Sequence, residues 1–352
     1  MSDYKNILLK EIQDLRDKIE AVQMPPELSD KLKRDVVALE RSVELGSYDE
    51  KYEKVSRYVD LVLRIPFGKT TNDNLDINRA KEVFNKHHYG LESIKNRFLE
   101  FVSVMNLRSQ KEDVSNIQST VLLLVGLVGT GKTTFAYSLA EALGRKLIRI
   151  PFGGLSNVSE LRGNSRLILG SEPGKLIRGV CDAGIMNPVF LLDEIDRIGK
   201  DALADVMGVL VELLDPAQNH SFVDSYVDYP VNLSRSIFLA TANNTVNITT
   251  AVMDRMEKLS MPSYSDQEKM KIGKDYILPE LLKTHGVRPG QFVIKEDVWQ
   301  QIVRPLGFDA GVRTLRRNLE SAIRKAARII IERGFKEVII TKDNIKIFIP
   351  RY

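Results

Sequence analysis

The sequence contains little cysteine, few aromatic residues and no long apolar run. Of its 352 residues only Cys181 is a cysteine, so no internal disulfide can form, and a lone thiol fits a reducing compartment. No apolar stretch approaches the roughly 20 residues that span a bilayer. The first residues, Met-Ser-Asp-Tyr-Lys-Asn, lack the apolar core of a signal peptide. We therefore predict a cytoplasmic protein that makes no membrane contact.

Neither sign of charge dominates the chain. It has 51 Lys and Arg against 47 Asp and Glu, an excess too small to indicate nucleic acid as a partner. No zinc-ligand spacing, aromatic-basic strip or DNA-binding motif is present, so no nucleic-acid partner is predicted. A hydrophobic content of 43% with 28% charged residues is typical of a globular protein with a real core, and the length suggests two or three domains.

One short segment carries the strongest functional pattern. Residues 121–125 are all apolar, and residues 126–133 follow the spacing Gly-x-x-x-x-Gly-Lys-Thr before a helical pattern begins. Glycines allow a tight turn whose N–H groups point at phosphate oxygens, Lys132 reaches the β- and γ-phosphates, and the Thr133 hydroxyl can ligate Mg²⁺. The pattern predicts binding of a nucleoside triphosphate, taken to be ATP with Mg²⁺, through Gly126, Leu127, Val128, Gly129, Thr130, Gly131, Lys132, Thr133 and Thr134.

A second pattern predicts hydrolysis of the nucleotide. Residues 189–192 are apolar and lead into Asp193 and Glu194, as in a buried parallel strand whose carboxyl end reaches a ligand crevice. In P-loop NTPases the first acid holds Mg²⁺. Glu194 would then orient and activate the attacking water. The other interpretation is a buried strand followed by a solvated helix start.

Three polar residues further along the chain are candidates for the rest of the site. Asn243 ends the apolar run 237–242 and could bond the attacking water or the γ-phosphate, although an Asn pair also suits a turn. Arg255 could reach a neighbouring subunit's nucleotide, or form an ordinary surface salt bridge. Arg313 begins a helix in the C-terminal region, where a small lid could fold over the nucleotide.

Periodicity predicts the order of the elements. Three helices are expected over residues 4–66, either as an arm for partners or as a bundle that packs on itself, and two more helices over 77–106. Strands at 121–125, 147–150, 189–192 and 236–241 alternate with helices, which indicates an α/β fold with a parallel sheet. Helices follow at 265–284, 295–304 and 311–333, with a possible strand pair at 337–341 and 346–349.

Several stretches of the chain resemble the AAA+ module of Lon proteases. The run Asp215-Pro216-Ala217-Gln218-Asn219-His220 is specific to Lon within AAA+ proteins, and the resemblance extends from about residue 14 to 352. It implies an AAA+ P-loop NTPase fold with a parallel sheet flanked by helices: a helical arm (1–68), a nucleotide-binding α/β domain (69–262) and a small, mainly helical lid (263–352). The other matching stretches are 88–91, 144–150, 190–196, 240–243, 253–257 and 310–313.

The resemblance also implies roles for individual residues. Asn243 becomes sensor 1, Arg255 the arginine finger and Arg313 sensor 2, while Tyr89 and Gly90 lie beside the adenine. Lon modules form hexameric rings that thread unfolded polypeptide through a pore. A homo-hexamer acting on unfolded or misfolded proteins is therefore expected.

The departures from the Lon pattern matter as well. The proteolytic domain with its Ser-Lys dyad should begin about where the sequence stops, so proteolysis would need a separate peptidase. Ile168, followed by Leu169, stands where the Lon pore loop carries an aromatic residue, and an aliphatic side chain lacks the flat contact area of a ring. Residues 204–208 also differ. These changes leave two readings open: an ATP-driven unfoldase, or a nucleotide-gated regulatory or assembly ATPase that switches a partner without threading substrate.

Overall fold

The computed structural model describes residues 2–44, 48–110, 121–168, 170–304 and 310–349. The chain divides into two compact units, and each is described by itself. The first unit comprises Met1–Leu75, Val104–Leu123 and Ala140–Lys258, and the second comprises Asp76–Ser103, Leu124–Leu139 and Leu259–Tyr352. Within the described ranges, no helix is both long enough and apolar enough to span a bilayer.

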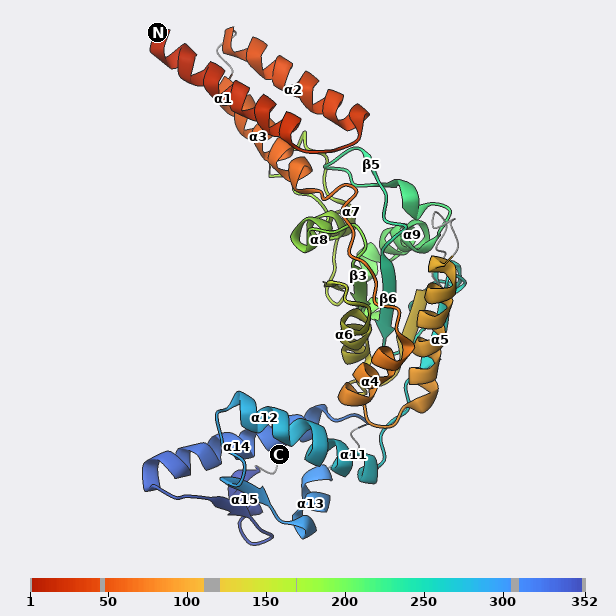
Figure 1. Cartoon of the computed structure of the whole chain (residues 1–352), viewed down its shortest axis with the longest axis vertical. Coiled ribbons are helices and arrows are strands. Elements are labelled where there is room, and N and C mark those ends of the chain that lie inside the picture. The colour runs from red at the N-terminus through yellow and green to blue at the C-terminus, as the bar shows by residue number, and fades with distance from the viewer. Residues whose placement is uncertain (1, 45–47, 111–120, 169, 305–309, 350–352) are drawn as a thin grey trace. The chain divides into compact units, whose positions relative to one another are not determined.

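The first unit begins with three packed helices. They are α1 (Ser2–Ala21), α2 (Pro26–Glu44) and α3 (Tyr48–Arg64), which lie side by side in Figure 1. Leu15, Leu32 and Val59, from the three apolar seams, are fully buried. The helices therefore form a bundle that packs on itself, as one of the two sequence interpretations proposed. We call it the helical arm.

A five-stranded sheet has the strand order β2-β3-β6-β1-β7. The strands β2, β3 and β6 pair in parallel, and Val189 of β3 lies opposite Ile237 of β6. Every residue of β3 and β6 is buried, as expected for strands covered on both faces. The carboxyl ends of β3 and β6 therefore meet at one edge of the sheet. The strands are β1 (Val121–Val125), β2 (Leu147–Pro151), β3 (Val189–Asp193), β6 (Ile237–Ala242) and β7 (Met256–Ser260).

Helices pack closely against this sheet. A Cβ atom on Gly179 of α8 would lie 2.6 Å from the Ile148 side chain of β2, so only glycine permits this approach. Helices α5 and α6, like strands β1 and β7, belong partly to each unit. The remaining elements here are α5 (Glu92–Ser109), α6 (Lys132–Leu143), α7 (Ser159–Arg162), α8 (Lys175–Ala183), α9 (Leu203–Leu214), α10 (Thr250–Met253), β4 (Phe222–Val223) and β5 (Pro230–Val231).

The second unit has its own apolar core, centred on Trp299, Leu315, Leu319 and Ile323. The helix predicted at 265–284 contains a π-helical segment, Gly273–Ile277, where Trp299 packs so closely that a Cβ on Gly273 would lie 2.8 Å from its ring. The elements are α4 (Ile77–His87), α11 (Asp266–Ile272), α12 (Leu278–Thr284), α13 (Trp299–Val303), α14 (Arg313–Arg333), α15 (Ile345–Phe348), β8 (Phe292–Ile294) and β9 (Val338–Ile340).

The strand predicted at 346–349 is wrong. Residues Ile345–Phe348 form helix α15, and strand β9 pairs in parallel with β8 instead. The sequence alternates apolar residues at 345, 347 and 349, but the structure buries Ile345, Phe348 and Ile349 and leaves Ile347 64% exposed. That burial follows the helical spacing, and the alternation is incidental.

Candidate nucleotide site

The phosphate loop lies in the second unit and has the expected backbone. Gly129 and Gly131 have φ angles of +82° and +96°, which side chains with a Cβ rarely adopt. Lys132 begins α6, and its Nζ donates to the carbonyl oxygens of Gly126 (2.6 Å) and Leu127 (2.9 Å). The ammonium group therefore lies over the concave backbone, where phosphate oxygens would replace the two carbonyl oxygens as acceptors.

Two later segments of the second unit enclose this loop. The Val312 N–H donates to the Gly129 carbonyl at 3.0 Å, and a Cβ on Gly311 would lie 2.3 Å from the Gly129 carbonyl carbon. The Tyr264 hydroxyl donates to the Thr130 carbonyl at 3.2 Å. Burial raises the pKa of Tyr264 to about 12, so the hydroxyl keeps its proton. Tyr264 was not singled out from the sequence, because no motif includes it.

Arg313 reaches the same loop. Its Cβ and N atoms would each lie 3.1 Å from a Cβ placed on Gly129. The structure therefore brings the predicted sensor 2 residue to the phosphate loop, at the first turn of α14.

A neutral histidine lies beside the start of α6. The His88 ring stacks on Phe135 with centroids 3.7 Å apart, and Nε2 lies 2.9 Å from the Ser138 hydroxyl. Burial, aided by His87 and Lys95, lowers the pKa of His88 to about 3. The predicted adenine-side residues Tyr89 and Gly90 follow in the chain, and Gly90 adopts a φ of +63°.

Asp193, in the first unit, forms an ion pair with the side chain of Arg149. It ends β3, and its Oδ2 accepts from the Arg149 Nε atom of β2 at 2.7 Å, while Oδ1 accepts from the Thr241 hydroxyl at 2.5 Å. The carboxylate is buried, whereas the Arg149 side chain is 53% exposed. The residue predicted to hold Mg²⁺ therefore has its charge balanced by a guanidinium that can be displaced.

Glu194 has a strained backbone. Its φ and ψ angles are +57° and +51°, a left-handed conformation that is uncommon for any residue but glycine. Its N–H donates to the Thr241 hydroxyl at 2.9 Å, and the carboxylate lies 3.5 Å from Arg197. Such a conformation costs energy, which the interactions of the surrounding fold must offset. Strained residues of this kind are found mostly at functional sites. Nothing in the sequence indicated it.

Asn243 and its neighbour Asn244 follow strand β6. Asn244 makes the turn, because its Oδ1 accepts from Val246 N at 3.0 Å and its N–H donates to buried Asp196. Asn243 follows β6 directly and is half-buried, at the sheet edge where β3 also ends.

Arg255 is engaged within its own chain. Its guanidinium pairs with Asp215 Oδ2 at 2.9 Å and donates to the Ala251 carbonyl at 2.8 Å. The Ala217 backbone N–H and Arg255 together lower the pKa of Asp215. In the described chain this is the salt bridge that the sequence left as the alternative. Its partner, though, is Asp215 of the Lon-specific run, not the adjacent Asp254.

The predicted pore loop is exposed at its tip and fixed at its base. We call residues 163–168 and 170–174 together the loop 163–174. Leu167 is 86% exposed and Ile168 is 59% exposed, while Leu169 lies outside the described residues. At the base, the buried Asp224 carboxylate accepts from the N–H groups of Gly174 (2.7 Å) and Tyr226 (2.9 Å).

The predicted site residues thus fall into two groups by unit. The phosphate loop, Tyr89, Gly90 and Arg313 belong to the second unit. Asp193, Glu194, Asn243 and Arg255 belong to the first. Their roles stay predictions.

Comparisons with known proteins agree with these motifs. The family model for the ATPase family associated with various cellular activities (AAA) matches residues 122–263, and the model for the Lon protease AAA+ ATPase lid domain matches residues 283–339. The chain is 39% identical to Lon protease 2 of Thermus thermophilus over 97% of the chain and 43% of that protein. It is 40% identical to the Lon protease of Dictyoglomus thermophilum over 97% of the chain and 42% of that protein.

The chain is also 37% identical to Lon protease 1 of Bacillus subtilis, over 43% of that protein. It therefore spans about two-fifths of the length of these curated relatives. The matched part holds the phosphate loop, the two acids at the carboxyl end of β3 and the lid. The chain therefore belongs to the Lon family of AAA+ ATPases and spans the AAA ATPase and lid regions of that family.

Proposed function

We propose that this module uses ATP hydrolysis to unfold, translocate or remodel protein substrates as a homo-hexamer. The observation that carries the proposal is the exposure of Leu167 and Ile168 on a loop whose base is fixed by buried hydrogen bonds. Solvent-exposed apolar side chains on a loop with a fixed base can pack against the apolar side chains of an unfolded polypeptide. The three-part division into arm, α/β domain and lid belongs to the same proposal.

The residues present suit ATP with Mg²⁺. The positive φ angles of Gly129 and Gly131 and the ammonium of Lys132 fit phosphate oxygens. The buried Asp193 carboxylate fits a cation, because a guanidinium now occupies one of its oxygens. In the described residues no group of three or more His, Cys, Asp or Glu could hold a metal alone. Mg²⁺ commonly uses only one or two carboxylates together with phosphates and water, so Asp193 and Thr133 would be its protein ligands.

The proposed catalytic roles follow from the chemistry of each side chain. Mg²⁺, when bound, neutralises charge on the phosphates. Glu194 orients the attacking water and accepts its proton, Asn243 hydrogen-bonds the water or the γ-phosphate, and Arg313 stabilises phosphate charge from the lid. Arg255 would exchange Asp215 for the nucleotide of a neighbouring subunit.

A nucleotide-gated regulatory or assembly ATPase is the second candidate. The observation that favours it is Ile168, an aliphatic residue at the position predicted to grip substrate. A smaller side chain buries less area against a threaded polypeptide.

Steady-state ATPase assays with and without casein separate the two candidates. Casein lacks a stable fold, so a threading motor should hydrolyse ATP faster in its presence. A rate that ignores casein would overturn the threading proposal and favour the gated ATPase. Leu167→Ser should reduce the stimulation but not the basal rate, because the exposed Leu167 side chain lies on the loop tip and not in the nucleotide site.

The role of Glu194 is tested separately. Glu194→Gln should keep ATP binding and lose at least about 100-fold in turnover, the usual contribution of a general base. Fluorescent-nucleotide binding and phosphate release measure the two effects. Asp201→Asn, at an exposed acid nearby, is the matched control. Hydrolysis that survives in Glu194→Gln would show that another group activates the water.

A further inference from the structure

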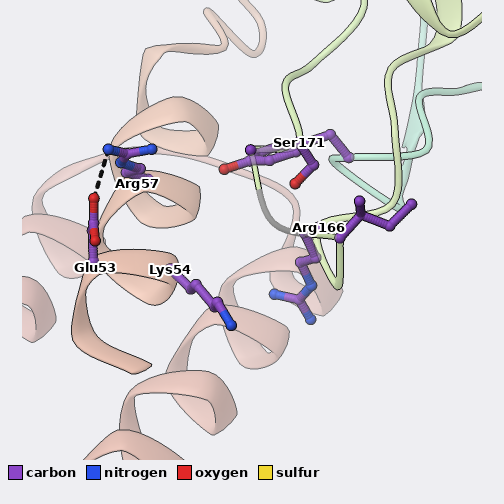
Figure 2. A pocket seen from close by; sticks show the side chains of 8 residues that line it. Glu53, Lys54, Arg57, Arg166 and Ser171 are labelled. Atoms are coloured by element: carbon purple, nitrogen blue, oxygen red, sulfur yellow. Dashed lines mark ion pairs between the residues drawn. The ribbon is translucent and has the colours of Figure 1, made fainter. Parts of the chain in front are cut away.

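A small pocket lies between helix α3 of the helical arm and the loop 163–174. Figure 2 shows Lys54 and Arg57 of α3 on one side and Arg166 and Ser171 of the loop on the other. The cavity measures about 90 Å³, several times what one water needs but well below the ~300 Å³ of a typical cofactor site. It can therefore admit a side chain or a small anion, and not a nucleotide.

Positive charge predominates in the lining. Lys54, Arg57 and Arg166 are cationic, and Glu53 is the acidic lining residue. Arg57 pairs with Glu53 at 2.6 Å, but both side chains are about two-thirds exposed, at 69% and 66%. Exposed pairs of this kind contribute little stability, so an incoming carboxylate can replace Glu53 at small cost.

Arg166 is pre-positioned for an anion. Its guanidinium lies over the Tyr58 ring, 4.2 Å from the centroid, and donates one N–H to Asp35 of α2 at 2.5 Å. A guanidinium has five N–H donors, so this contact leaves capacity for another acceptor. Burial raises the pKa of Tyr226 in the same lining, and the nearby Arg57 and Arg166 oppose that rise while Glu172 adds to it.

The pocket also has an apolar side. Ile168 and the Tyr226 side chain line it, and Ile168 belongs to the exposed tip of the loop. A ligand that fills it would present an anionic group to the arginines beside an apolar surface. A free inorganic anion would use only the first feature, whereas an acidic residue within an unfolded segment would use both.

We propose that this pocket binds the carboxylate of an acidic residue in a polypeptide segment that the loop 163–174 contacts. The proposal rests on the proposed protein-handling function and adds a preference within it. Segments in which Asp or Glu neighbours an apolar residue engage the loop more tightly than neutral or basic segments. The helical arm thus supplies part of the substrate-contacting surface through Lys54 and Arg57.

The test compares three labelled, unstructured peptides of equal length with central Glu-Leu-Glu, Gln-Leu-Gln or Lys-Leu-Lys. Their affinities are measured by fluorescence anisotropy with the full chain and a slowly hydrolysed ATP analogue. The acidic peptide should bind about tenfold more tightly than the amide peptide, which is ~1.4 kcal/mol, and the difference should shrink as salt is raised.

The double variant Lys54→Gln/Arg57→Gln should bring the acidic and amide peptides within about twofold of each other. Lys51→Gln is the control, because Lys51 is an exposed residue of the same helix, one turn away and outside the pocket lining. It should keep the full preference. A thermal melt checks that both proteins fold equally well.

Each other outcome has a defined meaning. Equal binding of the acidic and amide peptides to the wild type would overturn the pocket proposal and leave the protein-handling function standing. Absence of any peptide binding, together with a casein-insensitive ATPase, would remove both. Tripolyphosphate that binds more tightly than the acidic peptide and displaces it would show a site for free oxyanions, which also overturns the proposal.

Discussion

The charge on the buried Asp193 carboxylate is balanced by the half-exposed guanidinium of Arg149. The same oxygen is the one that a divalent cation would need. The two cations therefore compete, and the competition should be weak because solvent screens the exposed guanidinium. Arg149 would act as a counter-ion to this carboxylate in the absence of nucleotide.

Arg149→Gln should consequently strengthen divalent-cation binding a few-fold, an effect typical of one screened charge. Mn²⁺ binding followed by electron paramagnetic resonance measures this directly in the presence of nucleotide. Arg178→Gln, which removes an exposed arginine paired with Glu172, is the control. Weaker Mn²⁺ binding in Arg149→Gln would mean that Arg149 helps to hold the metal site together.

His88 makes folding stability depend on pH. Its pKa is 6.5 as a free side chain and about 3 in the fold, so the unfolded chain binds a proton that the folded chain does not. The stability from neutral His88 is complete above pH 6.5 and is lost as the pH falls below it, by ~1.4 kcal/mol per pH unit.

Urea unfolding at pH 7.0 and pH 5.5 tests this. The wild type should lose about 1 kcal/mol more than His88→Gln over that interval, because glutamine cannot take up the proton. His220→Gln, at an exposed histidine, should behave like the wild type. Equal losses in the wild type and in His88→Gln would show that His88 takes up its proton as readily in the fold as in the unfolded chain.

Single residues also mark the limit of what the sequence could predict. The phosphate loop and the acids at the carboxyl end of β3 could be identified because their chemistry depends on spacing within a few residues. Three other features could not be identified from the sequence: the left-handed backbone of Glu194, the Arg255–Asp215 ion pair and the stacking of His88 on Phe135. Each depends on which distant segments meet, and spacing carries no information about that.

The helices and strands also divide into those that a local sequence pattern predicts and those that depend on contacts with distant segments. Strands β1, β2, β3 and β6 were predicted to within a residue at either end because buried parallel strands are continuous apolar runs. Strand β7 was missed, since its sequence Met-Glu-Lys-Leu-Ser is half polar and only partly buried. The segment 345–349 has apolar residues that satisfy two periods at once, and only the packing of α15 on α14 decides between them.

The contact between the lid and the phosphate loop is an element-scale feature that can be tested. Gly311→Ala places a methyl group within about 2.3 Å of the Gly129 backbone, so the backbone must move. We expect a loss of about 1–3 kcal/mol of stability, as in overpacked cores, together with weaker nucleotide binding.

Gly208→Ala is the matched control, because a Cβ there has no described atom within 4 Å and lies within helix α9. That change should stabilise the protein by ~0.5–1 kcal/mol. Urea unfolding measures both variants. A Gly311→Ala protein as stable as the wild type would show that the lid segment can withdraw from the loop without cost.

At the scale of the whole molecule, activity depends on whether copies of the chain share a site. Arg255→Ala and Glu194→Gln should each be inactive alone. If Arg255 serves a neighbour's nucleotide, random mixing of the two in equal amounts should restore about a quarter of the sites, because each intact site then needs one subunit of each kind. Phosphate release after co-refolding or subunit exchange measures this. No recovery would confine Arg255 to its own chain.

The fixed base of the loop 163–174 has a mechanical consequence. A polypeptide that resists pulling exerts an equal and opposite force on Leu167 and Ile168, and this force reaches the rest of the protein through the Asp224 hydrogen bonds and the Arg166–Asp35 pair. If the module threads polypeptide as proposed, the load that it can sustain depends on these contacts as well as on the energy of ATP. Asp35→Asn, which weakens one of these contacts, should lower the stall force in an optical trap while the unloaded hydrolysis rate stays the same.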